Sequence, residues 1–156
     1  MENYVKPILA SLFVVALGLF GCATEPKPAP APVACTPPPA DLVTRDLAPG
    51  DGDTVRFRSA VLVSYTGWLY DGCKPDLKGA EFDTSAGRPT PFGFIVGAGR
   101  VIRGWDRGVI GMKEGGKRLL VIPASLGYGE RGVGKIPPNS ALVFEVKVEK
   151  IVAQPQ

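Results

Sequence analysis

The stretch Val101-Ile102-Arg103-Gly104-Trp105-Asp106-Arg107-Gly108-Val109 decides the fold of this chain. At the helical period its apolar side chains share one face, and its charged side chains point away from that face. Gly97 and Gly99 precede the stretch and Gly111 follows it, which predicts a short helix. Trp105 has a large apolar surface, so it either fills a core or forms the floor of an apolar pocket.

The composition excludes several kinds of chemistry. The chain has no histidine, which rules out catalytic triads, imidazole acid–base catalysis and histidine-ligated zinc. Its 3 cysteines cannot form a four-thiolate zinc site. A net charge of +3 on 156 residues, without a basic cluster, does not indicate nucleic-acid binding. We expect no cofactor, no metal and no nucleic-acid partner.

Residues 1–21 have the pattern of an export signal. Lys6 is followed by an apolar run from Ile8 to Phe20, which is shorter than the about 20 residues of a membrane-spanning helix. The run ends in Leu19-Phe20-Gly21-Cys22, which resembles the lipobox of bacterial lipoproteins. That resemblance implies a lipidated Cys22 and attachment to the bacterial cell envelope, at the outer membrane and facing the periplasm. The alternative is an uncleaved anchor with an ordinary cysteine.

Residues 22–40 follow as a linker. After the lipidated cysteine this segment is dominated by proline and alanine, and it has no periodic apolar face. We expect an extended spacer of about 3.1 Å per residue. A proline-rich docking motif is the less favoured alternative.

Residues 41–156 have the pattern of a globular domain. Alternating apolar and polar residues predict strands at Leu42–Leu47, Arg58–Tyr70, around Phe82, at Phe92–Val96, Lys117–Ile122 and Ala141–Val152. The last strand alternates most regularly, which is typical of an antiparallel sheet with one solvated face. The predicted fold is therefore α+β, with a curved antiparallel β-sheet wrapped around one short α-helix.

Several motifs, taken in order, resemble the FKBP-type peptidyl-prolyl cis-trans isomerases between Thr44 and Val152. They are Val63-Ser64-Tyr65-Thr66-Gly67, Glu81-Phe82-Asp83-Thr84-Ser85, Pro91-Phe92-Gly93-Phe94, Val101-Ile102-Arg103-Gly104-Trp105, Tyr128-Gly129 with Ile136-Pro137-Pro138, and Leu142-Val143-Phe144. The loop from Gly72 to Gly79 is longer than in minimal members of the family. The flap from Arg131 to Lys135 is about one residue shorter than in many of them.

The resemblance implies a proline-binding pocket and a rotamase activity. The implied pocket residues are Tyr65, Phe82, Asp83, Phe92, Val101, Ile102, Trp105, Tyr128, Ile136 and Phe144. Trp105 would lie under the proline ring, Ile102 N–H and the Tyr128 hydroxyl would bind the peptide, and Arg88 would hold the Asp83 carboxylate. The implied ligands are proline-containing polypeptides and macrolides of the rapamycin type. No dimerisation segment is visible in the sequence, so we expect a monomer.

Other interpretations stay open at this point. Taken singly, most of these residues are better explained as ordinary core positions, but so many aromatic residues around one short helix exceed what a small core needs. A module that holds proline segments without catalysis, such as a holdase, would need the same pocket, and a purely structural envelope lipoprotein is a third possibility. Cys35 and Cys73 are the two cysteines left after lipidation, so an oxidising compartment favours a disulfide between them over two free thiols.

Overall fold

The computed structural model describes residues 35–153. The predicted signal peptide, Cys22 and most of the predicted linker lie outside these residues. No helix in the described part of the chain is long and apolar enough to cross a membrane.

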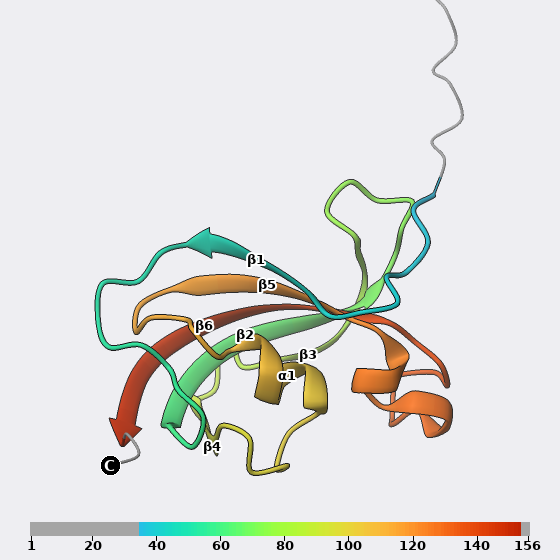
Figure 1. Cartoon of the computed structure of the whole chain (residues 1–156). Coiled ribbons are helices and arrows are strands. Elements are labelled where there is room, and N and C mark those ends of the chain that lie inside the picture. The colour runs from blue at the N-terminus through green and yellow to red at the C-terminus, as the bar shows by residue number, and fades with distance from the viewer. Residues whose placement is uncertain (1–34, 154–156) are drawn as a thin grey trace, which may run out of the picture. The chain divides into compact units, whose positions relative to one another are not determined.

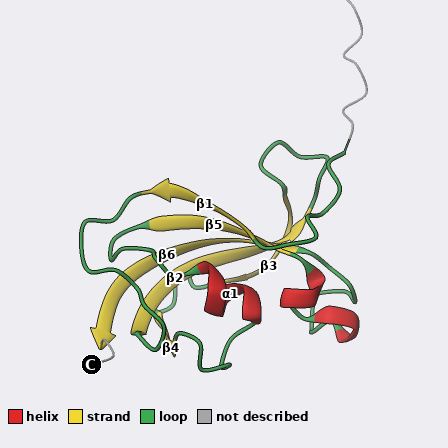
Figure 2. Ribbon diagram, in the orientation of Figure 1, coloured by secondary structure: helices red, strands yellow, loops and turns green. Residues whose placement is uncertain are grey.

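One antiparallel sheet dominates the domain (Figures 1 and 2). Its six strands are β1 (Val43–Ala48), β2 (Ala60–Tyr70), β3 (Lys78–Thr84), β4 (Phe92–Ile95), β5 (Lys117–Ile122) and β6 (Leu142–Ala153). The strand order is β1-β5-β6-β2-β3, and β4 also pairs with β2. Because β3 pairs with residues 66–70 of β2 and β4 with residues 60–63, these two strands share one edge of β2, end to end. The predicted sheet is thus confirmed.

The concave face of the sheet packs against α1 (Arg103–Gly108), as Figure 2 shows. Gly104 and Gly108 let the helix backbone approach β5 closely. A Cβ atom at Gly104 would lie 2.5 Å from Ile122 Cγ2, and one at Gly108 would lie 2.8 Å from Leu120 Cδ2. The two glycines are four residues apart and therefore lie on the same helix face. This close packing places Trp105 over the middle of the sheet.

Two short 3-10 helices complete the domain after β5. They are η1 (Ala124–Leu126) and η2 (Gly129–Arg131). The main core is formed by inward-facing side chains of the strands together with Trp105 and Val109 of the helix segment. Leu142, Phe144, Val146 and Val148 of β6 all belong to this core, as their alternation predicts.

The outer face of the sheet is not entirely solvated, which the alternation pattern did not indicate. At one end of it, Leu119, Val121 and Val143 form a second buried apolar cluster. Tyr70 and Leu77, which flank the long β2–β3 loop, pack against this cluster. Farther along the same face, Glu145 forms ion pairs with Lys78 and Lys117, as expected for solvated positions. The long loop therefore contributes to the hydrophobic packing of the domain.

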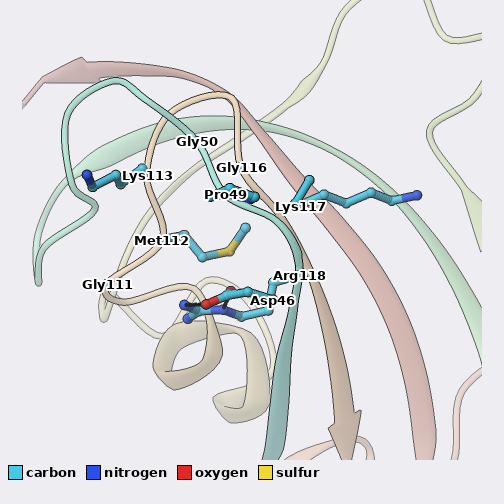
Figure 3. A pocket seen from close by; sticks show the side chains of 10 residues that line it. Asp46, Pro49, Gly50, Gly111, Met112, Lys113, Gly116, Lys117 and Arg118 are labelled. Atoms are coloured by element: carbon cyan, nitrogen blue, oxygen red, sulfur yellow. Dashed lines mark hydrogen bonds and ion pairs between the residues drawn. The ribbon is translucent and has the colours of Figure 1, made fainter.

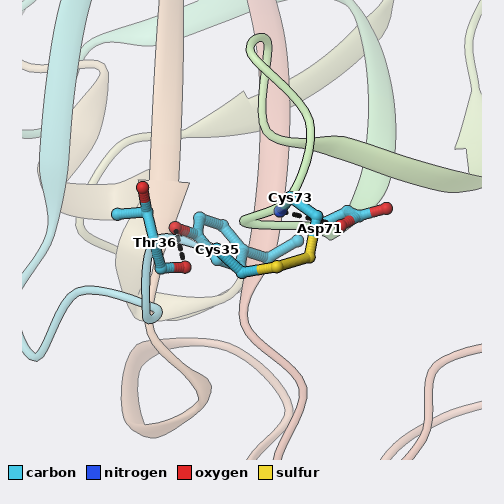
Figure 4. The surroundings of a disulfide bond; sticks show 5 residues. Cys35, Thr36, Asp71 and Cys73 are labelled. Atoms are coloured by element: carbon cyan, nitrogen blue, oxygen red, sulfur yellow. Dashed lines mark hydrogen bonds between the residues drawn. A yellow bond between two sulfur atoms is a disulfide. The ribbon is translucent and has the colours of Figure 1, made fainter. Parts of the chain in front are cut away.

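The segment before β1 is attached to that loop (Figure 4). A disulfide joins Cys35 to Cys73, with a Cα–Cα distance of 4.2 Å. Thr36 N–H donates a hydrogen bond of 2.8 Å to the Gly72 carbonyl, and the Tyr70 hydroxyl lies 3.1 Å from the carbonyls of Thr36 and Pro37. The end of the predicted linker thus packs on the domain from Cys35 onward.

Candidate active site

A cavity of about 350 Å³ opens between the concave face of the sheet and α1. Its lining contains nine of the ten predicted pocket residues, together with Arg88 and Arg100. The lining residues are Tyr65, Phe82, Asp83, Arg88, Phe92, Arg100, Val101, Ile102, Trp105, Tyr128 and Phe144. They come from β2, β3, β4, β6 and α1, from the loop after β3, from the residues just before α1, and from the segment between η1 and η2.

Ile136 is not among the residues that line this cavity, so its place in the pocket stays a prediction. Its side chain is 7% exposed and belongs to the main hydrophobic core. Its backbone forms a pair of hydrogen bonds with Val133, of 2.9 Å and 3.0 Å. These bonds connect the Arg131–Lys135 flap to the residue that follows it, so the Ile136 backbone holds one end of the flap in place.

Trp105 forms the base of the cavity. The indole is only 4% exposed, because aromatic rings surround it, yet it lines the open cavity. The rings of Tyr65 and Phe144 meet it edge to face, with centroids 4.9 Å and 5.3 Å away. Its Nε1 has no hydrogen-bond partner among the residues that the structure describes. The indole is held by packing in the hydrophobic core and presents an apolar surface to whatever enters the cavity.

A glycine in β2 allows two of the aromatic rings to come together. Gly67 faces the core side of the sheet, and a Cβ atom there would lie 2.6 Å from Phe144 Cε1 and 2.8 Å from Phe82 Cζ. The two rings meet edge to face with centroids 5.4 Å apart. The sequence analysis did not identify this role of Gly67, although the glycine interrupts an otherwise well-alternating strand, which often signals a close approach.

The polar groups of the cavity form one network. The Tyr65 hydroxyl donates a 2.6 Å hydrogen bond to Asp83 Oδ2, and Arg88 Nη2 donates a 2.6 Å hydrogen bond to Asp83 Oδ1. Burial and the hydrogen bond to Asp83 raise the pKa of Tyr65 to about 12. Both oxygens of the Asp83 carboxylate are therefore engaged, which holds it in one orientation.

Two hydrogen-bonding groups face the cavity without an internal partner. The Tyr128 hydroxyl has no hydrogen bond within residues 35–153, and its ring is 36% exposed. Burial, and then the charge of Asp83, raise the pKa of Tyr128, so the hydroxyl stays protonated at neutral pH. The Ile102 N–H precedes α1 and likewise has no acceptor in this part of the chain. Both groups are available to a ligand.

Arg100 lines the cavity and was missed in the sequence analysis. It precedes the apolar residues of the Val101–Val109 stretch, and an exposed arginine in a glycine-rich turn gives no recognisable signal. No ion pair involving Arg100 occurs among the described residues. The cavity rim therefore carries one more positive charge than the resemblance implied.

A second hollow, of about 220 Å³, lies between β1 and the turn before β5 (Figure 3). Its central charged group, Arg118, is bonded to Asp46 and donates further hydrogen bonds to the carbonyls of Gly108 and Ile110. No aromatic ring lines this hollow. Because the guanidinium of Arg118 is already engaged by these partners, we assign the hollow a structural role and no ligand.

Comparisons with known proteins agree with the fold and the cavity. A family profile described as "FKBP-type peptidyl-prolyl cis-trans isomerase" matches residues 49–149. An FK506-binding protein of Streptomyces anulatus is 49% identical over 69% of this chain and 83% of its own length. An FK506-binding protein of Neisseria meningitidis serogroup A is 46% identical over 70% of this chain and 95% of its own length.

Among solved structures, the crystal structure of FkpA from Escherichia coli is similar. It superposes with a TM-score of 0.62 at 39% sequence identity, covering 73% of this chain and 49% of FkpA. The family profile spans well over half of this chain, and the relatives match along most of their own length. This chain belongs to the FKBP-type peptidyl-prolyl cis-trans isomerase family.

Proposed function

We propose that the aromatic cavity accelerates X-Pro isomerisation by binding the proline ring over Trp105 and favouring the twisted amide. The observation that carries this proposal is the buried indole at the base of an open cavity, surrounded by aromatic rings. A proline ring matches such a surface in size and polarity, and the cavity leaves room for the flanking backbone.

The energetics of the peptide bond explain why such a cavity suffices. Amide resonance sets a barrier of about 18–20 kcal/mol to rotation. At the top of the barrier resonance is lost, and the carbonyl oxygen carries less negative charge than in the planar amide. A largely apolar site that excludes water therefore disfavours the planar, polar state relative to the twisted one. No nucleophile or proton shuttle is needed, and the lining supplies no histidine or cysteine.

The polar groups of the site have positioning roles in this proposal. The Ile102 N–H and the Tyr128 hydroxyl hydrogen-bond the peptide on either side of the proline, which favours a bent, type VI-like turn. Asp83 is held by Tyr65 and Arg88, so it acts as a fixed dipole beside the carbonyl rather than as an acid or base. The same cavity would take FK506 and rapamycin-type macrolides, since the relatives from Streptomyces and Neisseria are named as FK506-binding proteins.

We further propose that the protein acts on proline-containing segments of envelope proteins, as a lipid-anchored monomer. Support comes from the sequence of residues 1–21, from Cys22, and from the Cys35–Cys73 disulfide, which suits an oxidising compartment. Metabolic labelling with a fatty acid tests the anchor, because a Cys22→Ser variant would lose the label. Fractionation of the bacterial envelope tests the assignment to the outer membrane.

The activity is tested with a short X-Pro peptide in an isomerisation assay. The chain has two tryptophans, and Trp68 lies outside the cavity under Lys78, whose Nζ is 4.5 Å from the ring centroid. We expect Trp105→Ala to reduce kcat/KM by at least about tenfold and Trp68→Ala to leave it nearly unchanged. Turnover that survives both Trp105→Ala and Tyr128→Phe would refute the site. Binding of unfolded protein without any turnover would favour a holdase.

A further inference from the structure

Three large apolar side chains are exposed together outside the cavity. Phe57, Ile95 and Ile110 are 59%, 49% and 42% exposed. Two hollows of about 270 Å³ and 290 Å³ lie beside them, and Phe57 lines both. We call Phe57, Ile95 and Ile110, with Arg58 and Arg107, the Phe57 surface. Single exposed apolar residues are ordinary, whereas a group of them around hollows is typical of an interaction site.

The Phe57 ring is held in place although it is exposed. It lies directly against Gly97, since a Cβ atom at Gly97 would be 2.1 Å from Phe57 Cε2. The next residue, Arg58, has a φ of 69°, a conformation that costs a non-glycine residue free energy. Its N–H donates a 2.9 Å hydrogen bond to the Val96 carbonyl, which fixes the turn. The ring thus packs against Gly97 while most of it stays exposed, and the turn that carries it has some backbone strain.

The charge around this surface is positive. Arg58, Arg103 and Arg107 line the two hollows, and the only carboxylate that lines them is Asp106. Both oxygens of Asp106 accept backbone hydrogen bonds, from Gly97 N–H at 2.8 Å and Gly99 N–H at 3.1 Å. Neither Arg58 nor Arg107 forms an ion pair within residues 35–153. A partner with apolar and acidic side chains would complement this surface.

The Phe57 surface adjoins the active-site cavity. The segment from Gly97 to Arg103 separates them: Arg100 and the two residues after it line the cavity, whereas Gly97 and Arg103 line the hollow beside Phe57. Arg100 also leaves the near rim of the cavity positively charged. A polypeptide that places its proline over Trp105 can therefore continue across this segment onto the Phe57 surface.

We propose that the Phe57 surface binds an extended, acidic and apolar segment of the client polypeptide, next to the proline that occupies the cavity. This inference rests on the proposed isomerase function and specifies its substrate class. The flanking segment adds contacts that a short peptide cannot make, so it sets which X-Pro bonds the enzyme selects.

Two other occupants fit the structure less well. A symmetric contact with a second copy would bring the arginines of both surfaces together, which is unfavourable.

For a membrane, the attachment point lies at the other end of β2, so the anchor does not by itself bring the Phe57 surface to the lipid. Phe57 precedes the first residue of β2, whereas Cys73, bonded to Cys35, follows its last residue, Tyr70. The 11 residues of β2 separate the two ends by about 35 Å.

The test compares two variants of the full chain. Phe57→Ser/Arg107→Gln removes one apolar side chain and one charge from the surface. Val43→Ser/Arg45→Gln likewise replaces one apolar and one charged side chain, on the edge strand β1, where both side chains are exposed. The substrates are an X-Pro tetrapeptide and peptides that extend it, on one side or the other, by about ten residues of Asp, Glu and Leu, enough to reach the surface. Matched peptides carry Lys in place of the acidic residues.

For the wild-type chain we expect kcat/KM at low salt to be about tenfold higher for one acidic extension than for its Lys counterpart. The Phe57→Ser/Arg107→Gln variant should lose most of this preference, the β1 variant should keep it, and all three proteins should turn over the tetrapeptide equally. No preference in the wild type, or a preference that both variants keep, would overturn the proposal.

Two further measurements assign the surface to other occupants if the proposal is wrong. In a Cys22→Ser background, which removes the lipidation site, the proteins are mixed with phosphatidylglycerol vesicles. Co-sedimentation that only the Phe57→Ser/Arg107→Gln variant loses would overturn the proposal in favour of a membrane. A dimer in analytical ultracentrifugation that only this variant loses would overturn it in favour of self-association. Absence of tetrapeptide turnover, with selective binding of the acidic extension, would instead refute the proposed catalysis and leave the surface intact.

Discussion

The disulfide between Cys35 and Cys73 should be a major source of stability and should have little effect on catalysis. The bond joins residues that are 38 positions apart. By the chain-entropy relation, closing a loop of this length in the denatured state stabilises the native state by about 4 kcal/mol. For a domain of this size that corresponds to a melting temperature higher by about 15 °C.

The folded structure should survive removal of the bond. The Thr36 N–H and the Tyr70 hydroxyl still connect the segment before β1 to the β2–β3 loop. None of the residues that line the active-site cavity belongs to either segment. We therefore expect Cys35→Ala/Cys73→Ala to lower the free energy of unfolding while kcat/KM at 25 °C stays within about twofold of wild type.

Guanidinium unfolding, followed by far-ultraviolet circular dichroism, measures the effect. The Cys35→Ala/Cys73→Ala variant and the protein with both cysteines are compared in a Cys22→Ser background, so that no third thiol interferes. The Cys35→Ala/Cys73→Ala variant should unfold at a lower denaturant concentration, and a reducing agent should shift the protein with both cysteines to nearly the same midpoint. An unchanged midpoint in the variant would refute the reasoning, as would a loss of activity at temperatures where the variant is folded.

Three further predictions concern the site and the sheet. Tyr65→Phe removes the hydrogen bond to the pocket carboxylate while keeping the ring, so it should cost about 1 kcal/mol of unfolding free energy in urea titrations. Gly67→Ala should force Phe144 away and cost about 1–3 kcal/mol, with a fall in kcat/KM that Gly93→Ala, beside a movable leucine, does not show. For Glu145, burial alone would raise the pKa, but its two lysine partners lower it below the usual 4.5. This carboxylate therefore stabilises the fold above pH about 4.5, and the stabilisation is lost as the pH falls through its folded-state pKa. In Glu145→Gln the urea midpoint of unfolding should depend less on pH between pH 6 and pH 3 than in the wild type.

Much of the fold was predictable, because its determinants are local. The alternation in β6 identifies the core face of the sheet, and the spacing of apolar residues around Trp105 identifies the helix. The second apolar cluster was not predictable, because Val143 lies on the otherwise polar face of β6. Within residues 35–153 the cluster is covered by Tyr70, the last residue of β2, and by Leu77 of the following loop.

The site was predictable as a set of residues but not in its details. The motifs that carry the family resemblance contain the aromatic residues that line the cavity, so the resemblance was enough to name them. Ile136 comes from the motif Ile136-Pro137-Pro138, and in the structure its side chain packs in the main core, in the same cluster as Trp105. Arg100 and Gly67 were missed, since their roles depend on which residues the fold brings close to them in space.

The fluorescence of Trp105 on substrate binding tests the central claim most directly. In a Trp68→Phe background Trp105 is the sole indole of the chain. An X-Pro peptide that places its ring over this indole should change the emission, with a midpoint that matches the KM of isomerisation, and FK506 should reverse the change by competition. Turnover at the wild-type rate without any change in emission at saturating peptide would contradict the claim that the proline binds over the indole.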